Sequence, residues 1–69
     1  MTALQTAIGK VLEQLAELFA AKALKQRQIA AGLRACGNPE SALYASTKAS
    51  AFEEAEREVR DLIRTWNPP

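Results

Sequence analysis

The chain has 69 residues, of which 48% are apolar, and a formal net charge of +1 at neutral pH. Alanine, leucine, glutamate, lysine and arginine are abundant. Because these are strong helix formers, we expect one small all-α domain spanning residues 1–69. One cysteine and no histidine exclude a disulfide within the chain and the usual zinc, iron and copper sites, and we expect no cofactor. A chain this short buries only about 60% of the surface that its unfolded form exposes, so its own core contributes little stability.

The sequence has no pattern typical of a signal peptide. No apolar run approaches the roughly 20 residues that span a bilayer. We therefore expect a cytoplasmic protein that does not bind membranes.

The segment Cys36-Gly37-Asn38-Pro39-Glu40 predicts a sharp turn between two helices. Gly37 can adopt the left-handed conformation that ends a helix. Asn38 can accept a hydrogen bond from the first N–H groups of the next helix, and Pro39 suits a first helical position.

These signals define the expected elements. We expect a first helix over about residues 3–35, a turn over 36–38 and a second helix over about 39–66. Asn67-Pro68-Pro69 would end the second helix, because proline cannot continue it. The predicted fold is an antiparallel two-helix hairpin.

The first helix carries an apolar stripe about 120° wide, which we expect to face the core. Lys22 and Gln26 interrupt it, and we expect Lys22 to extend past the neighbouring alanines toward water rather than to be a buried amine. The stripe contains Leu4, Ile8, Val11, Leu12, Leu15, Leu18, Phe19, Ile29, Ala30 and Leu33.

The second helix has one apolar side and one charged side. Its charged side is expected to be solvated, with Glu53–Arg57 and Glu56–Arg60 ion pairs in the favourable i,i+4 order. The apolar stripe contains Tyr44, Ala45, Phe52, Ala55, Val59, Leu62, Ile63 and Trp66.

Folding the helices about Gly37 pairs residues whose numbers sum to about 75. Leu15 then meets Val59, and Leu12 meets Leu62 and Ile63. We therefore expect the densest packing at the open end of the hairpin and weaker packing near the turn, where the facing residues are mainly alanines. The predicted core or dimer-packing residues are Leu12, Leu15, Phe19, Phe52, Val59, Leu62 and Trp66.

Two helices cannot cover each other completely. Apolar edges remain, and Leu24 and Leu43 also point away from the seam between the helices. We expect a homodimer that forms a four-helix bundle, and burial against a different protein is the alternative.

The sequence offers little for catalysis. It has no glycine-rich phosphate loop, and no acid pair in an apolar setting. Cys36 lies at a helix C-terminus, where the dipole disfavours a thiolate, and we interpret it as a small turn residue. We expect a protein that is not an enzyme.

Charge is distributed unevenly along the predicted hairpin. The half nearest the turn, residues 22–52, holds five basic residues and one acidic residue, a net charge of +4. This end is expected to attract an acidic surface, and a partner protein fits better than nucleic acid because no DNA-reading motif is present. Tyr44, Arg34, Arg27 and Lys48 are the predicted contact residues, since tyrosine and arginine are common in binding hot spots. A plain core position remains the alternative for Tyr44.

The segment Asn38-Pro39-Glu40-Ser41-Ala42-Leu43-Tyr44, followed by Ala49-Ser50-Ala51-Phe52-Glu53-Glu54-Ala55-Glu56, resembles small early proteins of Pseudomonas phages. In size and layout the chain is similar to the quorum-sensing anti-activators among them. The resemblance implies a dimeric helical hairpin in the cytoplasm of a bacterial host. It also implies inhibition of a host protein, such as a LuxR-type regulator or the type IV pilus assembly ATPase.

A second family is also similar. Met1-Thr2-Ala3-Leu4, and the Pro39-Glu40 helix start followed by Ala49, Ala51, Phe52 and Glu53, resemble a needle-protein co-chaperone of type III secretion. This resemblance implies a short hairpin that stabilises a partner chaperone.

Overall fold

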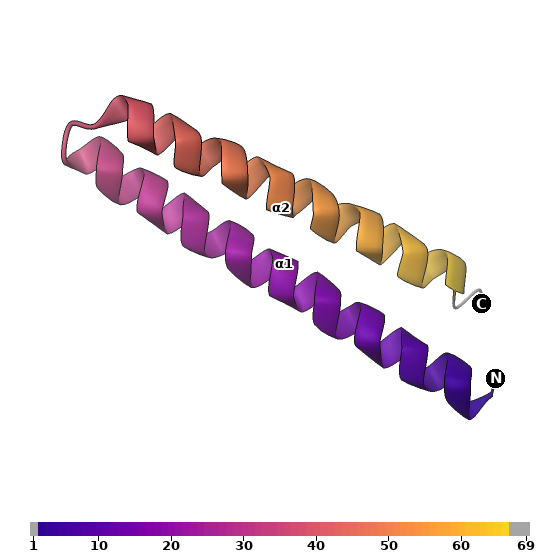
Figure 1. Cartoon of the computed structure of the whole chain (residues 1–69). Helices are drawn as coiled ribbons and strands as arrows, with labels where there is room; N and C mark the ends of the chain where they lie inside the picture. The colour runs from indigo at the N-terminus through magenta and orange to yellow at the C-terminus, as the bar shows by residue number, and fades with distance from the viewer. Residues whose placement is uncertain (1, 67–69) are drawn as a thin grey trace.

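The computed structural model describes residues 2–66 and contains two antiparallel helices, α1 (Ala3–Ala35) and α2 (Pro39–Trp66). They form a rod of 53 × 15 × 14 Å, with the turn at one end and the start of α1 and the end of α2 at the other (Figure 1). The predicted all-α hairpin is confirmed, and both helices have the expected bounds. The predicted stop signal, Asn67-Pro68-Pro69, lies outside the described residues.

The turn ends α1 by the glycine mechanism that the sequence predicts. Gly37 has a φ of 76°, in the left-handed region that side chains disfavour. Its N–H donates to the carbonyl of Arg34 at 3.0 Å, and the N–H of Asn38 donates to the carbonyl of Leu33 at 2.9 Å. This pair of bonds is a Schellman motif, which satisfies carbonyls at the end of α1. The Oδ1 of Asn38 accepts from the N–H of Ser41 at 3.4 Å, as expected of a cap.

The start of α1 is also capped. The Oγ1 of Thr2 accepts from the N–H of Gln5 at 3.2 Å, and the Gln5 side chain accepts from the N–H of Thr2 at 2.8 Å. This reciprocal capping box satisfies two backbone donors that no helical carbonyl can reach.

A seam of very small residues holds the helices together. In α1 the buried positions recur every seventh residue, at Gly9, Ala16, Ala23 and Ala30. In α2 the buried residues are Ala42, Ala45 and Ala49. Seven-residue spacing keeps one side of a helix against an antiparallel partner, and methyl-sized side chains let the two backbones approach closely.

Larger side chains flank this seam and are only half-buried. The rings of Phe19 and Phe52 stack with centroids 6.3 Å apart. At the open end the indole Nε1–H of Trp66 donates to the carbonyl of Gln5 at 3.2 Å. These contacts are compatible with the predicted register, in which facing residue numbers sum to about 75.

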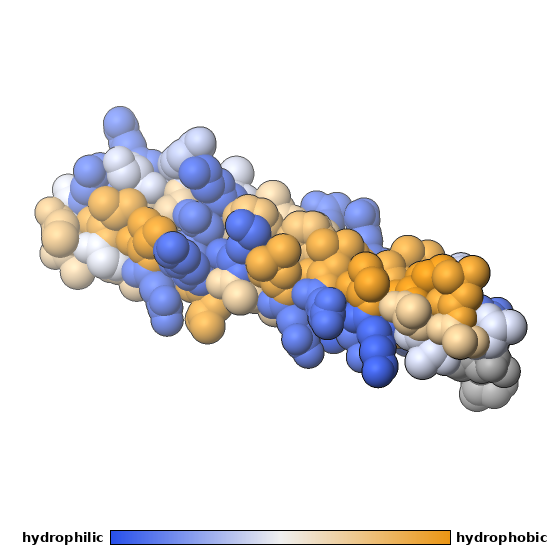
Figure 2. Space-filling model, turned by 60° about the horizontal axis from the view of Figure 1, so that its bottom comes forward, coloured by the Kyte–Doolittle hydropathy of each residue, from blue (hydrophilic) through white to orange (hydrophobic). Residues whose placement is uncertain are grey.

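The expected place of the core is wrong. Every buried hydrophobic side chain in residues 2–66 is an alanine, and most lie in the middle and turn-end parts of the hairpin. Of the residues predicted for core or dimer packing, Leu15, Leu62 and Trp66 are 37%, 50% and 38% exposed, whereas Leu12, Phe19, Phe52 and Val59 are half-buried. The reason is that α1 turns its small residues toward α2, which leaves Leu4, Val11 and Leu18 exposed beside the seam. Figure 2 shows an apolar band along the surface of the hairpin.

Substitution by alanine should have opposite effects on stability at the two glycines near the end of α1. Gly37→Ala should lower the free energy of unfolding by about 1–2 kcal/mol, because alanine resists a left-handed backbone. Gly32→Ala should raise it by about 0.5–1 kcal/mol, because Gly32 is helical and a methyl group there would meet no atom within 4 Å. Urea unfolding followed by circular dichroism measures both. Equal effects of the two substitutions would contradict the turn geometry.

The alanine seam should not tolerate a large side chain. Ala30 is 1% exposed, so Ala30→Leu should destabilise the hairpin by about 1–3 kcal/mol through overpacking. Ala31→Leu, at the next and exposed position, is the matched control and should change stability by about 0.5 kcal/mol or less. Stability of Ala30→Leu equal to that of the control would show that the helices are not closely packed there.

Candidate interaction surfaces

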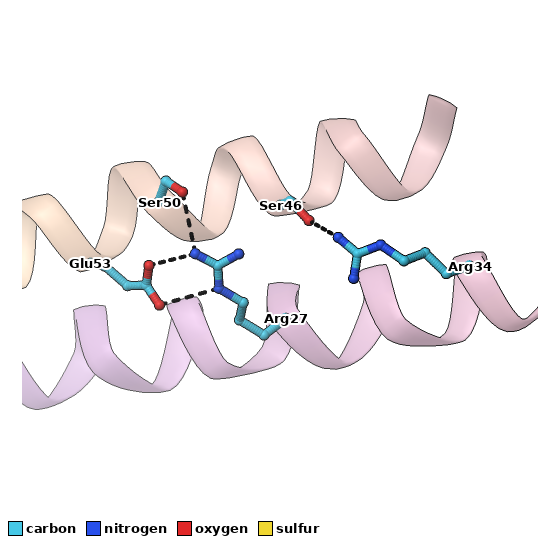
Figure 3. Close-up of polar contacts among 5 residues, drawn as sticks. All are labelled: Arg27, Arg34, Ser46, Ser50 and Glu53. Atoms are coloured by element: carbon cyan, nitrogen blue, oxygen red, sulfur yellow. Dashed lines mark hydrogen bonds and ion pairs between the residues drawn. The ribbon is translucent and has the colours of Figure 1, made fainter. Parts of the chain in front are cut away.

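A polar edge formed by Arg27, Arg34, Ser46, Ser50 and Glu53 runs beside the alanine seam (Figure 3). Arg27 binds Glu53 with two parallel bonds, Nη2 to Oε1 at 2.6 Å and Nε to Oε2 at 3.2 Å. Its Nη2 also donates to the Oγ of Ser50 at 3.2 Å. Bidentate pairing of this kind fixes geometry more strongly than a single contact, so Arg27 joins α1 to α2.

The ion pair changes the protonation equilibria of both side chains. The hydrogen bond from Arg27, and then its charge, lower the pKa of Glu53 despite some desolvation. The same hydrogen bond, and the negative charge of Glu53, raise the pKa of Arg27. Both side chains are about two-fifths exposed, so solvent screens the interaction and it supplies alignment more than stability.

Arg34 makes a second cross-helix contact on this edge. Its Nη2 donates to the Oγ of Ser46 at 2.8 Å. A serine hydroxyl is neutral, so this contact positions Arg34 without neutralising its charge. Arg34 therefore remains a positive group near the turn.

Tyr44 and Lys48 lie on a different side of α2. Residues two positions apart on a helix point in nearly opposite directions, so Tyr44 points away from the edge that holds Ser46. Tyr44 is 65% exposed, and the ammonium of Lys48 lies 4.5 Å from its ring centroid. This is a cation–π contact between neighbours one helical turn apart. Tyr44 is thus a surface residue and not the core aromatic of the alternative interpretation.

The four predicted contact residues therefore do not form one cluster. The structure brings Arg27 and Arg34 to the polar edge and Tyr44 with Lys48 to another side. Lys22 lies above the ring of Phe52, with its ammonium 5.8 Å from the centroid, an aromatic neighbour that the sequence did not predict.

Sequence reasoning missed the polar edge. Glu53 was expected to pair with Arg57, whereas it binds Arg27 across the hairpin. The predicted Glu56–Arg60 pair is present at 2.7 Å, and Arg64 pairs with Asp61. The signal that could have revealed the edge is the seven-residue spacing of Gly9, Ala16, Ala23 and Ala30, which sets the rotation of α1.

The other surface features include a shallow hollow and an exposed thiol. A shallow hollow of about 360 Å³ near the open end is lined by Glu13, Glu17, Arg60, Ile63 and Arg64. No group of three potential metal-ligating side chains comes together within residues 2–66. The lone thiol, Cys36, is exposed at the turn. Neither described helix has a stretch long and apolar enough to cross a membrane.

Comparison of the chain with protein-family models, with characterised proteins and with solved structures gave no match.

The Arg27–Glu53 pair should make stability depend on pH. Because its pKa is lowered on folding, Glu53 contributes stability that is present above the ordinary glutamate pKa of about 4.3. This contribution is lost as the pH falls through the lowered value. Glu53→Gln should therefore melt below the wild type at neutral pH, and the difference should shrink in acid.

Thermal melts across the acidic range measure this effect. Glu54→Gln, a substitution at the adjacent exposed acid, is the control and should cause little change at any pH. A melting difference for Glu53→Gln that stays constant on acidification would show that the ion pair does not form in solution.

Proposed function

We propose that the chain is a non-enzymatic interaction module that binds a host bacterial protein and blocks its activity. The observation that carries the proposal is the surface near the turn, where Leu43 and Tyr44 are exposed, Lys48 lies against the Tyr44 ring and Arg34 lies on the polar edge at a different side. Leu43 and Tyr44 are 68% and 65% exposed. Large exposed apolar and aromatic side chains near several basic residues are typical of a surface that binds another protein.

The charges of this surface favour an acidic partner. Arg27 is neutralised by Glu53, but Arg34 and Lys48 keep their charge beside a serine hydroxyl and a tyrosine ring. Lys22 and Lys25 add to this half of the hairpin, and Glu40 is the single acid between residues 22 and 52. Such a field attracts acidic protein surfaces.

The resemblance to phage quorum-sensing anti-activators supports a narrower proposal. A phage-encoded hairpin of this size would act in the cytoplasm of its host. Its partner would be a LuxR-type quorum-sensing regulator or the type IV pilus ATPase. Binding would prevent the regulator from contacting DNA, or the ATPase from assembling the pilus, and no chemical step would be needed.

A needle-protein co-chaperone is the second candidate. It is favoured by the leucines of α1 that lie outside the seam, Leu4 and Leu18, which are 70% and 50% exposed. A co-chaperone needs an apolar face of this kind to hold its chaperone. It should be poorly soluble alone and become stable only with that chaperone.

Nucleic-acid binding, the third alternative, gains nothing from the polar edge because Arg27 is paired there. A small accessory protein of that class should shift duplex DNA with a steep dependence on salt. No shift at low salt would exclude it.

The contact residues can be tested by direct binding. Tyr44→Ala and Arg34→Glu should each weaken binding to the purified DNA-binding region of a LuxR-type regulator, or to the purified pilus ATPase, by about tenfold or more. Loss of a central aromatic group or reversal of a charge is the physical reason. Biolayer interferometry measures the dissociation constants.

The control is Lys10→Glu, which makes the same kind of charge change at an exposed residue near the opposite end of the hairpin. It should leave binding within about twofold if contact is local. Unchanged binding by Tyr44→Ala and Arg34→Glu, with helicity intact, would exclude the surface near the turn.

A further inference from the structure

One apolar stripe of α1 is only partly covered within the hairpin. It consists of Leu4, Ile8, Val11, Leu15 and Leu18, hereafter the leucine stripe, and its alternating spacing of four and three residues is that of a coiled-coil seam. Leu4, Val11 and Leu18 are 70%, 62% and 50% exposed. Figure 2 shows an apolar band that is continuous toward the free ends and broken by hydrophilic side chains nearer the turn.

The exposed area of the hairpin is large for its mass. A compact monomer of 7.5 kDa would expose about 4,200 Å², whereas this chain exposes 5103 Å². The excess is close to the roughly 800 Å² that each partner buries in a standard protein interface. One interface of ordinary size would therefore give the hairpin the exposed area of a compact protein.

The interior of the hairpin contributes little stability, so the chain needs an interface that it can form with another copy of itself. Its buried hydrophobic side chains within residues 2–66 are all alanines, and an alanine methyl group contributes far less than a buried leucine. Small domains with so little core usually gain stability from oligomerisation when they lack disulfides and metals. A second copy can supply this whenever the protein is made, whereas a foreign partner supplies it only when present.

We propose that a second copy of this chain covers the leucine stripe, with the two α1 helices antiparallel about a two-fold axis near Val11. Such an axis places Leu4 against Leu18 of the partner, Ile8 against Leu15 of the partner, and the two Val11 side chains together. The same patch then serves both subunits, as a two-fold interface requires. Among the exposed apolar residues of α2, Leu62 and Trp66 also have the four-residue spacing, but Leu43 and Tyr44 lie near the other end of the helix. The exposed stripe of α2 is therefore shorter than that of α1, so α1 provides the interface.

Two lysines set the direction of pairing. Lys22 and Lys25 continue the four-and-three spacing beyond Leu18. A parallel dimer would place each of them against its own copy, which is unfavourable, since charged residues in a seam specify register and orientation. In the antiparallel dimer both lie beyond Ala3, the first residue of the partner's α1.

Self-association therefore uses residues separate from the proposed surface near the turn. Either proposal can fail while the other holds. Loss of the dimer is seen in the mass of the isolated protein, and loss of partner binding is seen in the binding measurement.

The experiment measures the mass of the isolated chain by sedimentation velocity over a range of concentrations. The wild type should be a dimer. Val11→Glu and Leu18→Glu should each raise the dimer dissociation constant at least about tenfold, because they bury an unpaired charge. Leu24→Glu and Leu43→Glu place the same charge at leucines that are 60% and 68% exposed outside the stripe, and both variants should remain dimeric.

A cysteine-pairing experiment tests the register in chains that keep the apolar interface. In a Cys36→Ser background, Val11→Cys should form a disulfide-linked dimer on mild oxidation, because the axis brings the two residues together. Leu4→Cys alone should form little, and Leu4→Cys combined with Leu18→Cys should form it readily.

Three results would overturn the proposal. The first is a wild type that is monomeric, including one that stays soluble only with a chaperone. The second is a loss of the dimer in Leu24→Glu and Leu43→Glu equal to that in the stripe variants, and the third is an equal disulfide yield from Leu4→Cys and Val11→Cys. The last is expected of a parallel dimer.

Discussion

Close approach of α1 and α2 requires a side chain no larger than a methyl group at every seventh residue of α1. Gly9, Ala16, Ala23 and Ala30 meet this requirement, and Ala42, Ala45 and Ala49 meet it from α2. A leucine at these positions would separate the backbones and remove the contacts beside the seam. The cross-helix bonds of Arg27 and Arg34 depend on that short separation, because each spans from one helix to the other.

The same seam decides what the surface carries. Since α1 presents its small residues to α2, several of its large aliphatic residues, such as Leu4, Val11 and Leu18, face outward. The edge with Arg27 and Glu53 is polar. The two helices thus produce a polar edge, an apolar stripe near the free ends and a basic region near the turn. This division separates the surface that we propose for self-association from the surface that we propose for an acidic partner.

The sequence allowed the helices and the turn to be predicted because their signals are local. Gly37, Asn38 and Pro39 act within a few residues. The position of the turn also sets the register, in which the numbers of facing residues sum to about 75. The rotation of α1 could not be found by locating the largest apolar residues, since Leu15 and Leu18 lie outside the seam. The roles of Glu53 and Ser46 also escaped prediction, because each depends on a residue in the other helix.

The most direct test of this account is a methyl–methyl nuclear Overhauser measurement on protein with labelled alanine and leucine methyl groups, mixed with unlabelled protein to separate contacts within a chain from those between chains. Ala30 and Ala45 are 1% and 3% exposed, and the register places them opposite each other. The account predicts a strong contact between their methyl groups within one chain and none between Leu18 and the α2 alanines. Strong contacts from Leu18 to α2 within one chain, with no Ala30–Ala45 contact, would contradict it.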